Sequence, residues 1–432
     1  MSSPVRLYNS LTRRKEELPR PPGPIRVYVC GPTVYQRIHI GNARPYVIFL
    51  WLERWLELQG YDVRLVENIT DINDKIYDAA LKEGIPSAEL AKRATRWYLE
   101  DTDDLGLGRP DVEPLATESI PEIVGLIEEL VRRELAYESG GDVYFRVARF
   151  PEYGSLSGAQ LDDMVAQEPS DLKEDPRDFA LWKATKEGED TSWDSPWGRG
   201  RPGWHIECSA MAEKHLGPEF EVHGGGLDLR FPHHENELAQ SRGAGRPFAR
   251  LWAHNGLLEL AQEKMSKSVG NIVSLRDVLD TYGRDAILVL FAGAHYRSPV
   301  EYSDEAMEAA RAQAEGFRTA FRVAASRSAA GWDDFAAALD DDFNTPAALA
   351  LLHGWRAAGQ VDLLERGLQV FGLGVETRTD EVPEEIRRLA EERSLAREQK
   401  DFARADELRA EIERHGWEVQ DVAEGFRLVP KT

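Results

Sequence analysis

Cysteine is scarce in this sequence, because Cys30 and Cys208 are the only two among 432 residues. A framework of several disulfides is therefore excluded, since at most one bridge can form. Long apolar runs are also missing: no stretch of about 18 apolar residues occurs, and the N-terminal MSSPVRLYNSLTRRKEELPRPPGP lacks the apolar segment of a secretory signal. We expect a cytoplasmic protein that does not interact with a membrane.

Positive charge is the second shortage. The chain has 53 lysines and arginines against 76 aspartates and glutamates, which gives a formal net charge of −23. Such a charge favours solubility and opposes non-specific binding to nucleic acid. The remaining composition, 42% hydrophobic and 30% charged, is typical of a globular protein, and the length is sufficient for two or three domains.

The N-terminal part predicts a strand, a helix and a second strand. IRVYVCGPTV predicts a buried strand that ends at Gly31 and Pro32, and ARPYVIFLWLERWLELQG predicts a long apolar helix that ends at Gly60. YDVRLVENI predicts the second strand. Strands joined in this way run parallel and bind ligands at their carboxyl ends, so we expect a binding site directly after the first strand.

The periodicity of the remaining chain indicates an α/β fold with an insertion. Beyond residue 117 the pattern is interrupted by one helix, ESIPEIVGLIEELVRREL, one short strand, DVYFRV, and a polar stretch. The α/β pattern resumes with FEVHG, a helix opened by Pro232, RLWAHNGLL and one continuous helix, VLDTYGRDAILVLFAG. We expect two halves of a parallel-sheet domain at 1–117 and 206–300, a connecting insertion at 118–205, a helical bundle at 301–376 and a small α+β unit at 385–432.

Two motifs are suited to phosphate groups. In CGPTVYQRIHIGNARP, His39, Gly41 and Asn42 lie where a strand turns into a helix, so backbone N–H groups and the helix dipole can attract an anion. In EKMSKSVGN, Lys264 and Lys267 can neutralise a triphosphate and the departing pyrophosphate. Taken singly, the first motif also fits a simple turn and the second a solvated surface loop.

The stretch FPHHENE suggests metal binding. His233 and Glu237 stand at i, i+4, and His234 and Glu237 at i, i+3, so spacing leaves the choice of histidine open. Two thiolates, from Cys30 and Cys208, would complete a ligand set that suits zinc. The alternative is that the cysteines are small buried hydrophobic residues and that the histidine merely begins a helix.

Together the two phosphate motifs resemble those of the class I aminoacyl-tRNA synthetases, whose HIGH-type and KMSKS motifs flank an ATP site on a Rossmann-type fold. Asn42 replaces the usual second histidine of the first motif, and its amide can still donate a hydrogen bond. Further stretches resemble the cysteinyl-tRNA synthetases: LYNSLTRRKEEL, NITDINDKI, DFALWK, PGWHIECSAMA, HGGGLDLRFPHHENE, HYRSPVEYSDEAM and LDDDFNTPAAL. TDINDK departs from the commoner TDIDDK of that family at Asn73.

The resemblance implies ATP-dependent ligation of L-cysteine to tRNA(Cys) through cysteinyl-adenylate, with ATP and Mg²⁺ as substrate and a zinc ion that binds the cysteine thiolate. It also implies a monomer whose 385–432 unit binds the anticodon. The zinc ligands of the family fall on Cys30, Cys208, His233 and Glu237, which selects His233 over His234. ATP contacts fall on His39, Gly41, Asn42, Gly225, Gly226, Asp228, Lys264 and Lys267, and the cysteine pocket on Thr70, Trp204 and His233.

Two other functions are compatible with parts of this pattern. The cysteine ligase of mycothiol synthesis resembles the same family and transfers cysteine to an amino sugar, but it lacks a full anticodon-binding region. A non-catalytic tRNA-binding paralogue is the second alternative. The complete KMSKS motif and the four candidate metal ligands argue against it, since sites without a function tend to lose such residues.

Overall fold

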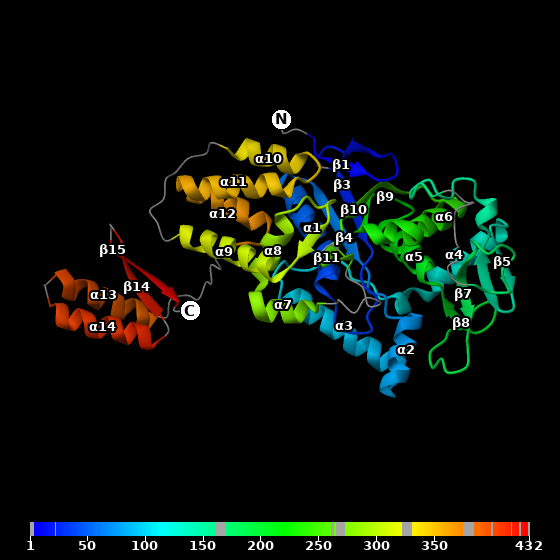
Figure 1. The fold of residues 1–432 in the computed structure, drawn as a ribbon, viewed down its shortest axis with the longest axis horizontal. Coiled ribbons are helices and arrows are strands. Elements are labelled where there is room, and N and C mark those ends of the chain that lie inside the picture. The colour runs from blue at the N-terminus through cyan, green and yellow to red at the C-terminus, as the bar shows by residue number, and fades with distance from the viewer. Residues whose placement is uncertain are drawn as a thin grey trace. The chain divides into compact units, whose positions relative to one another are not determined.

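Figure 1 shows a computed structural model of the chain. It describes residues 4–21, 23–159, 169–260, 263–264, 273–321, 331–374, 384–398, 401–415, 417–422 and 425–430. The chain divides into two compact units, Met1–Leu373 and Gly374–Thr432. No helix of the described residues is long and apolar enough to cross a membrane.

A four-stranded parallel sheet forms the centre of the first unit, in the order β10, β9, β3, β4. Its strands are rich in apolar residues because helices cover both faces of the sheet. The predicted α/β fold with a parallel sheet is therefore confirmed. The strands are β3 (Pro24–Val29), β4 (Asp62–Glu67), β9 (Glu219–Gly226) and β10 (Phe248–Asn255), and the hairpin β1 (Arg6–Asn9) and β2 (Arg14–Glu17) precedes them.

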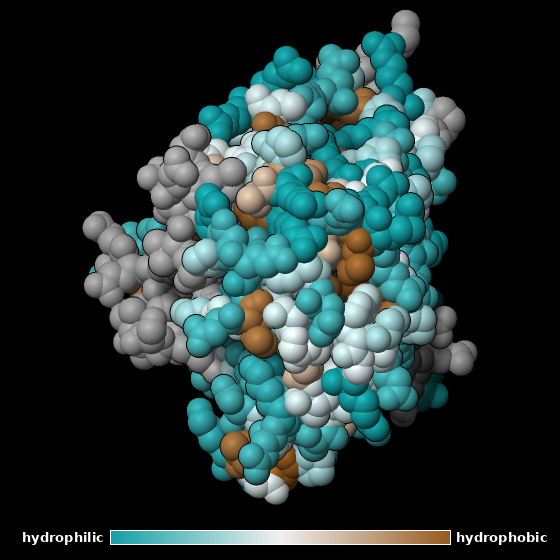
Figure 2. All heavy atoms as spheres, turned by 90° about the vertical axis from the view of Figure 1, so that its right-hand side faces the viewer, coloured by the Kyte–Doolittle hydropathy of each residue, from teal (hydrophilic) through white to brown (hydrophobic). Residues whose placement is uncertain are grey.

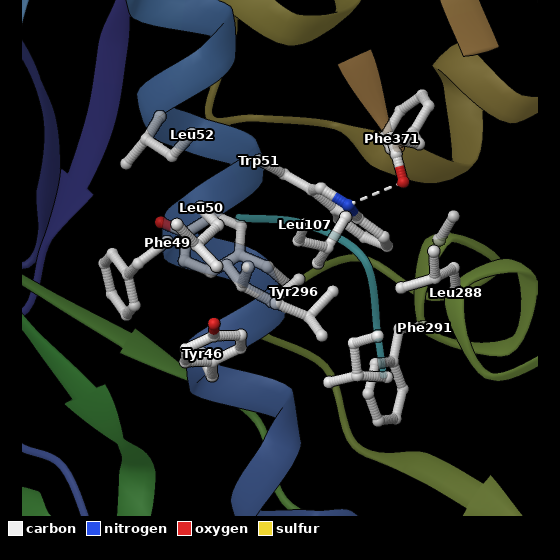
Figure 3. Packing of buried hydrophobic residues seen from close by; sticks show 14 of the residues in the cluster. Tyr46, Phe49, Leu50, Trp51, Leu52, Leu107, Leu288, Phe291, Tyr296 and Phe371 are labelled. Carbon is white, nitrogen blue, oxygen red and sulfur yellow. Dashed lines mark hydrogen bonds between the residues drawn. The ribbon is translucent and has the colours of Figure 1, made fainter. Parts of the chain in front are cut away.

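Helix α1 (Ile40–Leu58) connects β3 to β4 and contributes more buried residues to the main hydrophobic core than any other described helix or strand. Trp51 and Trp55 are completely buried on it, and each indole N–H has a partner. Trp51 Nε1 donates to the carbonyl oxygen of Phe371 at 2.9 Å, as Figure 3 shows, and Trp55 Nε1 donates to Asp340 Oδ1 at 3.1 Å. Because both acceptors belong to the helical region after residue 300, α1 joins that region to the sheet.

The insertion contains more regular structure than the sequence predicts. The expected helix is present as α4 (Ile120–Arg132), but the single expected strand is one of four in an antiparallel sheet. The additional strands escaped prediction because they are only three to six residues long, too short for a recognisable alternation of apolar and polar residues. The four strands are β5 (Ala136–Ser139), β6 (Asp142–Phe145), β7 (Phe179–Ala184) and β8 (Gly200–Pro202). Figure 2 faces this side of the chain, whose surface is mainly hydrophilic with scattered apolar spots.

One helix predicted in the second half of the sheet domain is wrong. The continuous helix expected in VLDTYGRDAILVLFAG is two helices, α7 (Leu275–Tyr282) and α8 (Arg284–Ala292). Gly283 separates them, because its φ of 78° and ψ of 162° interrupt the helical hydrogen-bond ladder. Helical backbone geometry resumes at Pro232 after an extended Phe231 and continues into α6 (Glu235–Gly243), while α5 (Trp204–Leu216) precedes β9.

Helices dominate the rest of the first unit. α2 (Asp74–Glu83) and α3 (Ser87–Asp103) follow β4. The short strands β11 (Leu258–Leu260), β12 (Glu263–Lys264) and β13 (Val300–Tyr302) form a small sheet. The predicted bundle consists of α9 (Asp304–Ala320), α10 (Trp332–Asp340), α11 (Thr345–Ala358) and α12 (Val361–Val370).

The second unit has the predicted order of two helices and two strands. α13 (Glu384–Glu398) and α14 (Phe402–Arg414) precede the antiparallel pair β14 (Trp417–Val422) and β15 (Gly425–Pro430). Ile386, Leu408, Ile412 and Trp417 belong to a separate small core, which makes this unit compact by itself.

Candidate functional site

A cavity of about 460 Å³ opens at the carboxyl ends of the parallel strands, the position expected for a ligand site in such a sheet. We call it the edge cavity. Residues of the segments 30–45, 226–229 and 255–258 line it, together with Glu67, Lys75 and Trp204. His39, Gly41, Asn42, Gly226 and Asp228, all predicted to contact ATP, are among the lining residues.

The first turn of α1 presents the HIGN motif to the edge cavity. His39 precedes the helix with an extended backbone, and a Cβ on Gly41 would lie 2.9 Å from His39 Nδ1, so a larger residue here would displace the imidazole. The expected free N–H groups are only partly available. Ile40 donates its N–H to Val273 O at 3.1 Å and Asn42 donates to His39 O at 2.9 Å. Attraction of an anion therefore depends more on the helix dipole and side chains.

The segment that follows the second phosphate motif, from Val273 onward, is hydrogen-bonded to the chain around the first phosphate motif. Besides the bond from Ile40 to Val273, the N–H of Leu275 donates to Ile38 O at 3.0 Å. The described chain from Val273 onward therefore lies against the HIGN motif, although more than two hundred residues separate the two segments. Lys264 is in β12, and its side chain is not described. Lys267 lies outside the described residues.

Four buried side chains converge beside the edge cavity. Cys30 directly follows β3, Cys208 is on α5, and His233 and Glu237 occupy the last turn before α6 and its first turn. One donor atom from each lies within 4.8 Å of the other three. Glu237 Oε1 is 3.3 Å from Cys30 Sγ and 3.1 Å from His233 Nε2. The four residues predicted as metal ligands are therefore brought together.

Burial shifts the protonation of these donors. It raises the pKa of the Cys30 thiol well above its usual range and also raises that of Cys208, while it lowers the pKa of His233 well below its usual value. In each case desolvation is the largest cause. Without a cation the cluster favours neutral thiols and a neutral imidazole, and a bound cation would compensate two thiolates.

The sequence did not predict the role of His223 on β9. Its Nε2 lies 2.8 Å from Glu237 Oε2, and both side chains are completely buried. Pairing of the parallel strands places it in one row with Tyr28 and Trp252. A histidine at the carboxyl end of a buried strand, directly before a glycine run, is the signal that could have identified it. Cys30, His223, His234 and Glu237 form a second donor group of the same size.

Of three further residues predicted to bind the substrates, Trp204, Thr70 and Gly225, only Trp204 is among the described residues that line the edge cavity. The Trp204 ring lies 4.3 Å from the His233 ring and lines the edge cavity. Thr70 is buried, accepts a hydrogen bond from Asn68 Nδ2 at 3.1 Å, and is not among the described lining residues. A Cβ on Gly225 would lie 2.8 Å from His234 Cε1, so this glycine makes room for an imidazole.

Asn73, where the motif departs from TDIDDK, caps α2. Its side-chain oxygen accepts a hydrogen bond from the N–H of Lys75 at 3.1 Å. An aspartate would accept the same bond, so the departure preserves the helix start.

The sequence is similar to known enzymes along nearly its whole length. Residues 18–312 match the family described as tRNA synthetases class I (C) catalytic domain, and residues 334–360 match the DALR domain. A cysteine–tRNA ligase of Geobacillus sp. (strain WCH70) is 42% identical, with 98% of this chain and 99% of that protein covered. The cysteine–tRNA ligase of Laribacter hongkongensis is 44% identical, with 98% of each covered.

Solved structures share the fold at low sequence identity. Methionyl-tRNA synthetase of Mycobacterium tuberculosis, in complex with methionyl-adenylate, has a TM-score of 0.56 at 18% identity and covers 81% of this chain and 82% of that one. The LeuRS of Agrobacterium radiobacter K84, in a ternary complex with tRNA and LeuAMS, has a TM-score of 0.58 at 13% identity, with 81% and 84% covered.

Proposed function

We propose, since the chain belongs to the cysteine–tRNA ligase family of class I tRNA synthetases, that Cys30, Cys208, His233 and Glu237 bind one zinc ion beside an ATP site in the edge cavity. The enzyme joins cysteine to tRNA in an ATP-dependent reaction. The observation that carries the proposal is the convergence of two thiols, an imidazole and a carboxylate within 4.8 Å at the edge of this cavity.

The donor atoms of Cys30, Cys208, His233 and Glu237 fit zinc better than those of the second donor group, which has His223 and His234 in place of Cys208 and His233. Two thiolates with one imidazole and one carboxylate are a set that zinc prefers, whereas the second group contains only one thiol. His234 in that group already contacts His254, with 2.9 Å between Nδ1 and Nε2. His223 is better suited to orient Glu237, because it binds Oε2, whereas Oε1 faces Cys30 and His233. Residues around metal ligands commonly have this role.

Recognition of the cysteine side chain is the reason for placing a metal here. An ordinary pocket separates isosteres such as a thiol and a hydroxyl by only about 10²-fold. When bound, zinc supplies a soft Lewis acid that takes up a thiolate far more readily than an alcohol. Trp204, whose ring lies 4.3 Å from that of His233 at an angle of 37°, lines the edge cavity beside this position.

The residues of the edge cavity act on ATP by position and charge. His39 and Asn42 contact the phosphates, Gly226 and Asp228 contact the adenosine, and Mg²⁺ accompanies the nucleotide. The cysteine carboxylate attacks the α-phosphorus, the bond to the β-phosphate oxygen breaks, and pyrophosphate leaves. The terminal ribose hydroxyl of the tRNA then takes the cysteinyl group and AMP leaves. Both steps require orientation and stabilisation of charge rather than a covalent enzyme intermediate.

Lys264 and Lys267 neutralise the developing pyrophosphate charge in this proposal. We also assign binding of tRNA(Cys) to the bundle and the small C-terminal unit, with the anticodon read by the latter. The enzyme acts as a cytoplasmic monomer. The similarity to cysteine–tRNA ligases extends over 98% of the chain, so it includes these C-terminal parts, which the mycothiol ligase alternative does not explain.

The test is cysteine-dependent exchange between ATP and pyrophosphate, followed by charging of tRNA(Cys), combined with elemental analysis. Wild-type protein should contain one zinc per chain, and Cys208→Ser should lose zinc and cysteine activation together while its far-UV circular dichroism is retained. Zinc-free wild-type protein with full exchange activity would refute the metal site. Transfer of cysteine to an amino sugar but not to tRNA would favour the mycothiol ligase, and absence of any exchange would favour the paralogue.

A further inference from the structure

Arg44 carries a positive charge into the interior without a carboxylate to balance it. It is on the first turns of α1, two residues after Asn42, and its side chain is completely buried. Desolvation lowers the pKa of its guanidinium to about 10, and no acidic side chain of the described residues counteracts this effect. Burying an uncompensated charge is costly, whereas an apolar side chain could fill the same space without that cost.

The guanidinium instead binds backbone carbonyl groups of two separate segments. Nη1 of Arg44 lies 2.5 Å from Gly256 O and 3.1 Å from Leu257 O, and Nη2 lies 3.3 Å from His295 O. The first segment follows β10 and the second follows α8. A further bond joins them, because Gly256 donates its N–H to Tyr296 O at 2.7 Å. Arg44 thus fixes the mutual placement of α1 and both segments.

One of these segments is a wall of the edge cavity. Residues 255–258 line it and adjoin the HIGN motif, since a Cβ on Gly41 would lie 3.7 Å from the Cβ of Leu258. The backbone of Ser298 packs closely against this wall, since a Cβ on Gly256 would lie 2.2 Å from Ser298 O. The wall therefore has little room to move toward Ser298. The width of the cavity between the wall and the helix therefore depends on the bonds from Arg44.

We propose that Arg44 is a positioning residue for the nucleotide, which holds the backbone wall 255–258 at the distance from α1 that ATP requires. The inference rests on the proposed function, which places ATP in the edge cavity. Arg44 does not touch the nucleotide and acts through the carbonyl groups that it binds. The wall follows β10, whereas Cys30 of the metal cluster follows β3, and β9 separates these two strands in the sheet. We therefore expect cysteine binding to depend less on the wall.

Arg54 offers a matched control on the same helix. It is partly buried, desolvation lowers its pKa, and its Nη2 donates to a backbone carbonyl, that of Leu107, at 2.6 Å. Leu107 is not among the described residues that line the edge cavity. Arg44→Met removes three bonds from a guanidinium of α1 to backbone carbonyl groups and Arg54→Met removes one, but only the first variant releases the cavity wall.

The experiment measures pyrophosphate exchange at varied ATP and at varied cysteine, well below the melting temperature of each variant. Arg44→Met should raise KM for ATP about 10- to 100-fold, as expected for lost hydrogen bonds to a charged group, and change KM for cysteine less than about threefold. Arg54→Met should leave KM for ATP within about twofold. Arg44→Lys, which keeps the charge and reaches fewer carbonyl groups, should give an intermediate KM for ATP.

An equal rise of KM for ATP in both methionine variants, or equal changes for ATP and cysteine, would overturn the inference by showing a general structural role. If Arg44→Met does not fold, Arg44→Lys decides alone, and a wild-type KM for ATP in that variant overturns it. These outcomes leave the proposed function intact, because that function is tested on wild-type protein by its zinc content, its pyrophosphate exchange and its charging of tRNA(Cys).

Discussion

His223 holds one oxygen of the Glu237 carboxylate, with 2.8 Å between Nε2 and Oε2, and leaves the other oxygen facing Cys30 and His233. The imidazole is itself fixed in place, because its ring stacks on that of Trp252 with 4.4 Å between the centroids. The orientation of a candidate ligand on α6 is thus determined by two strands of the sheet, β9 and β10.

Replacing His223 should weaken zinc binding without removing a ligand. Residues that orient metal ligands typically contribute 10- to 100-fold in affinity, so we expect a loss of about that size in His223→Ala. Competition with a chromogenic chelator measures the affinity directly. His353→Ala, which removes a half-buried histidine bound to Gln313 on the bundle, is the control and should bind zinc normally. Unchanged zinc affinity in His223→Ala would exclude the orienting role.

The charge of Lys267 should matter most in the transition state, where negative charge develops on pyrophosphate. Lys267→Ala should therefore lower kcat for adenylate formation by roughly 10²-fold or more, with a smaller change in KM for ATP. Single-turnover measurement of adenylate formation tests this. Lys186→Ala, at an exposed position of the insertion, is the control. Near-normal adenylate formation in Lys267→Ala would count against the assignment.

The second unit should be removable without loss of amino-acid activation. The truncation must retain Phe371, whose carbonyl accepts the Trp51 indole N–H, and Leu373, which belongs to the core of the first unit. A chain that ends at Gly374 should keep cysteine-dependent pyrophosphate exchange and show a steeply raised KM for tRNA(Cys). A shorter chain that also lacks Phe371 should be less stable. Unaltered charging by the first truncation would exclude an anticodon role for the second unit.

Asp340 and Asp341 are neighbours with opposite effects of pH on stability. Burial raises the pKa of Asp340 to about 6, although its Oδ1 accepts the Trp55 N–H. The folded state thus holds a proton that the unfolded state releases, so the free energy of unfolding should decrease as pH rises from about 4 to about 6. Asp340→Asn keeps the acceptor and should stabilise the protein at pH 7 by about 1 to 3 kcal/mol.

Asp341 supplies the matched comparison. A hydrogen bond from Lys15 and the nearby charge of Arg6 lower its pKa. Lys15 Nζ lies 3.0 Å from Asp341 Oδ1, and Arg6 Nη2 lies 2.9 Å from the same oxygen. Its contribution to stability is present above the ordinary aspartate pKa and is lost as pH falls below it. Asp341→Asn should therefore slightly destabilise the protein at pH 7. Thermal unfolding from pH 4 to 8 measures both variants, and shifts of the same sign would contradict the assignment.

The order of the main elements could be predicted from local patterns. Apolar strands, the long helix that ends before Gly60 and the two phosphate motifs are each specified by residues close in sequence. For that reason the parallel sheet, the bundle and the order of elements in the second unit were predicted correctly. The predictions that missed, one strand in place of four in the insertion and a continuous helix across Gly283, concern strands of three to six residues and a single backbone angle. Neither produces a clear periodicity.

The sequence by itself determined the types of donor available, two thiols in the whole chain and two histidines in FPHHENE, because composition and spacing are properties of the chain alone. Only the tertiary structure decided which of them meet. Cys30 and Glu237 are separated by 207 positions and lie 3.3 Å apart, since parallel pairing of β3 with β9 and the packing of α6 bring them together. The bonds of Arg44 to Gly256 and His295 likewise join segments more than two hundred positions apart, which no local pattern specifies.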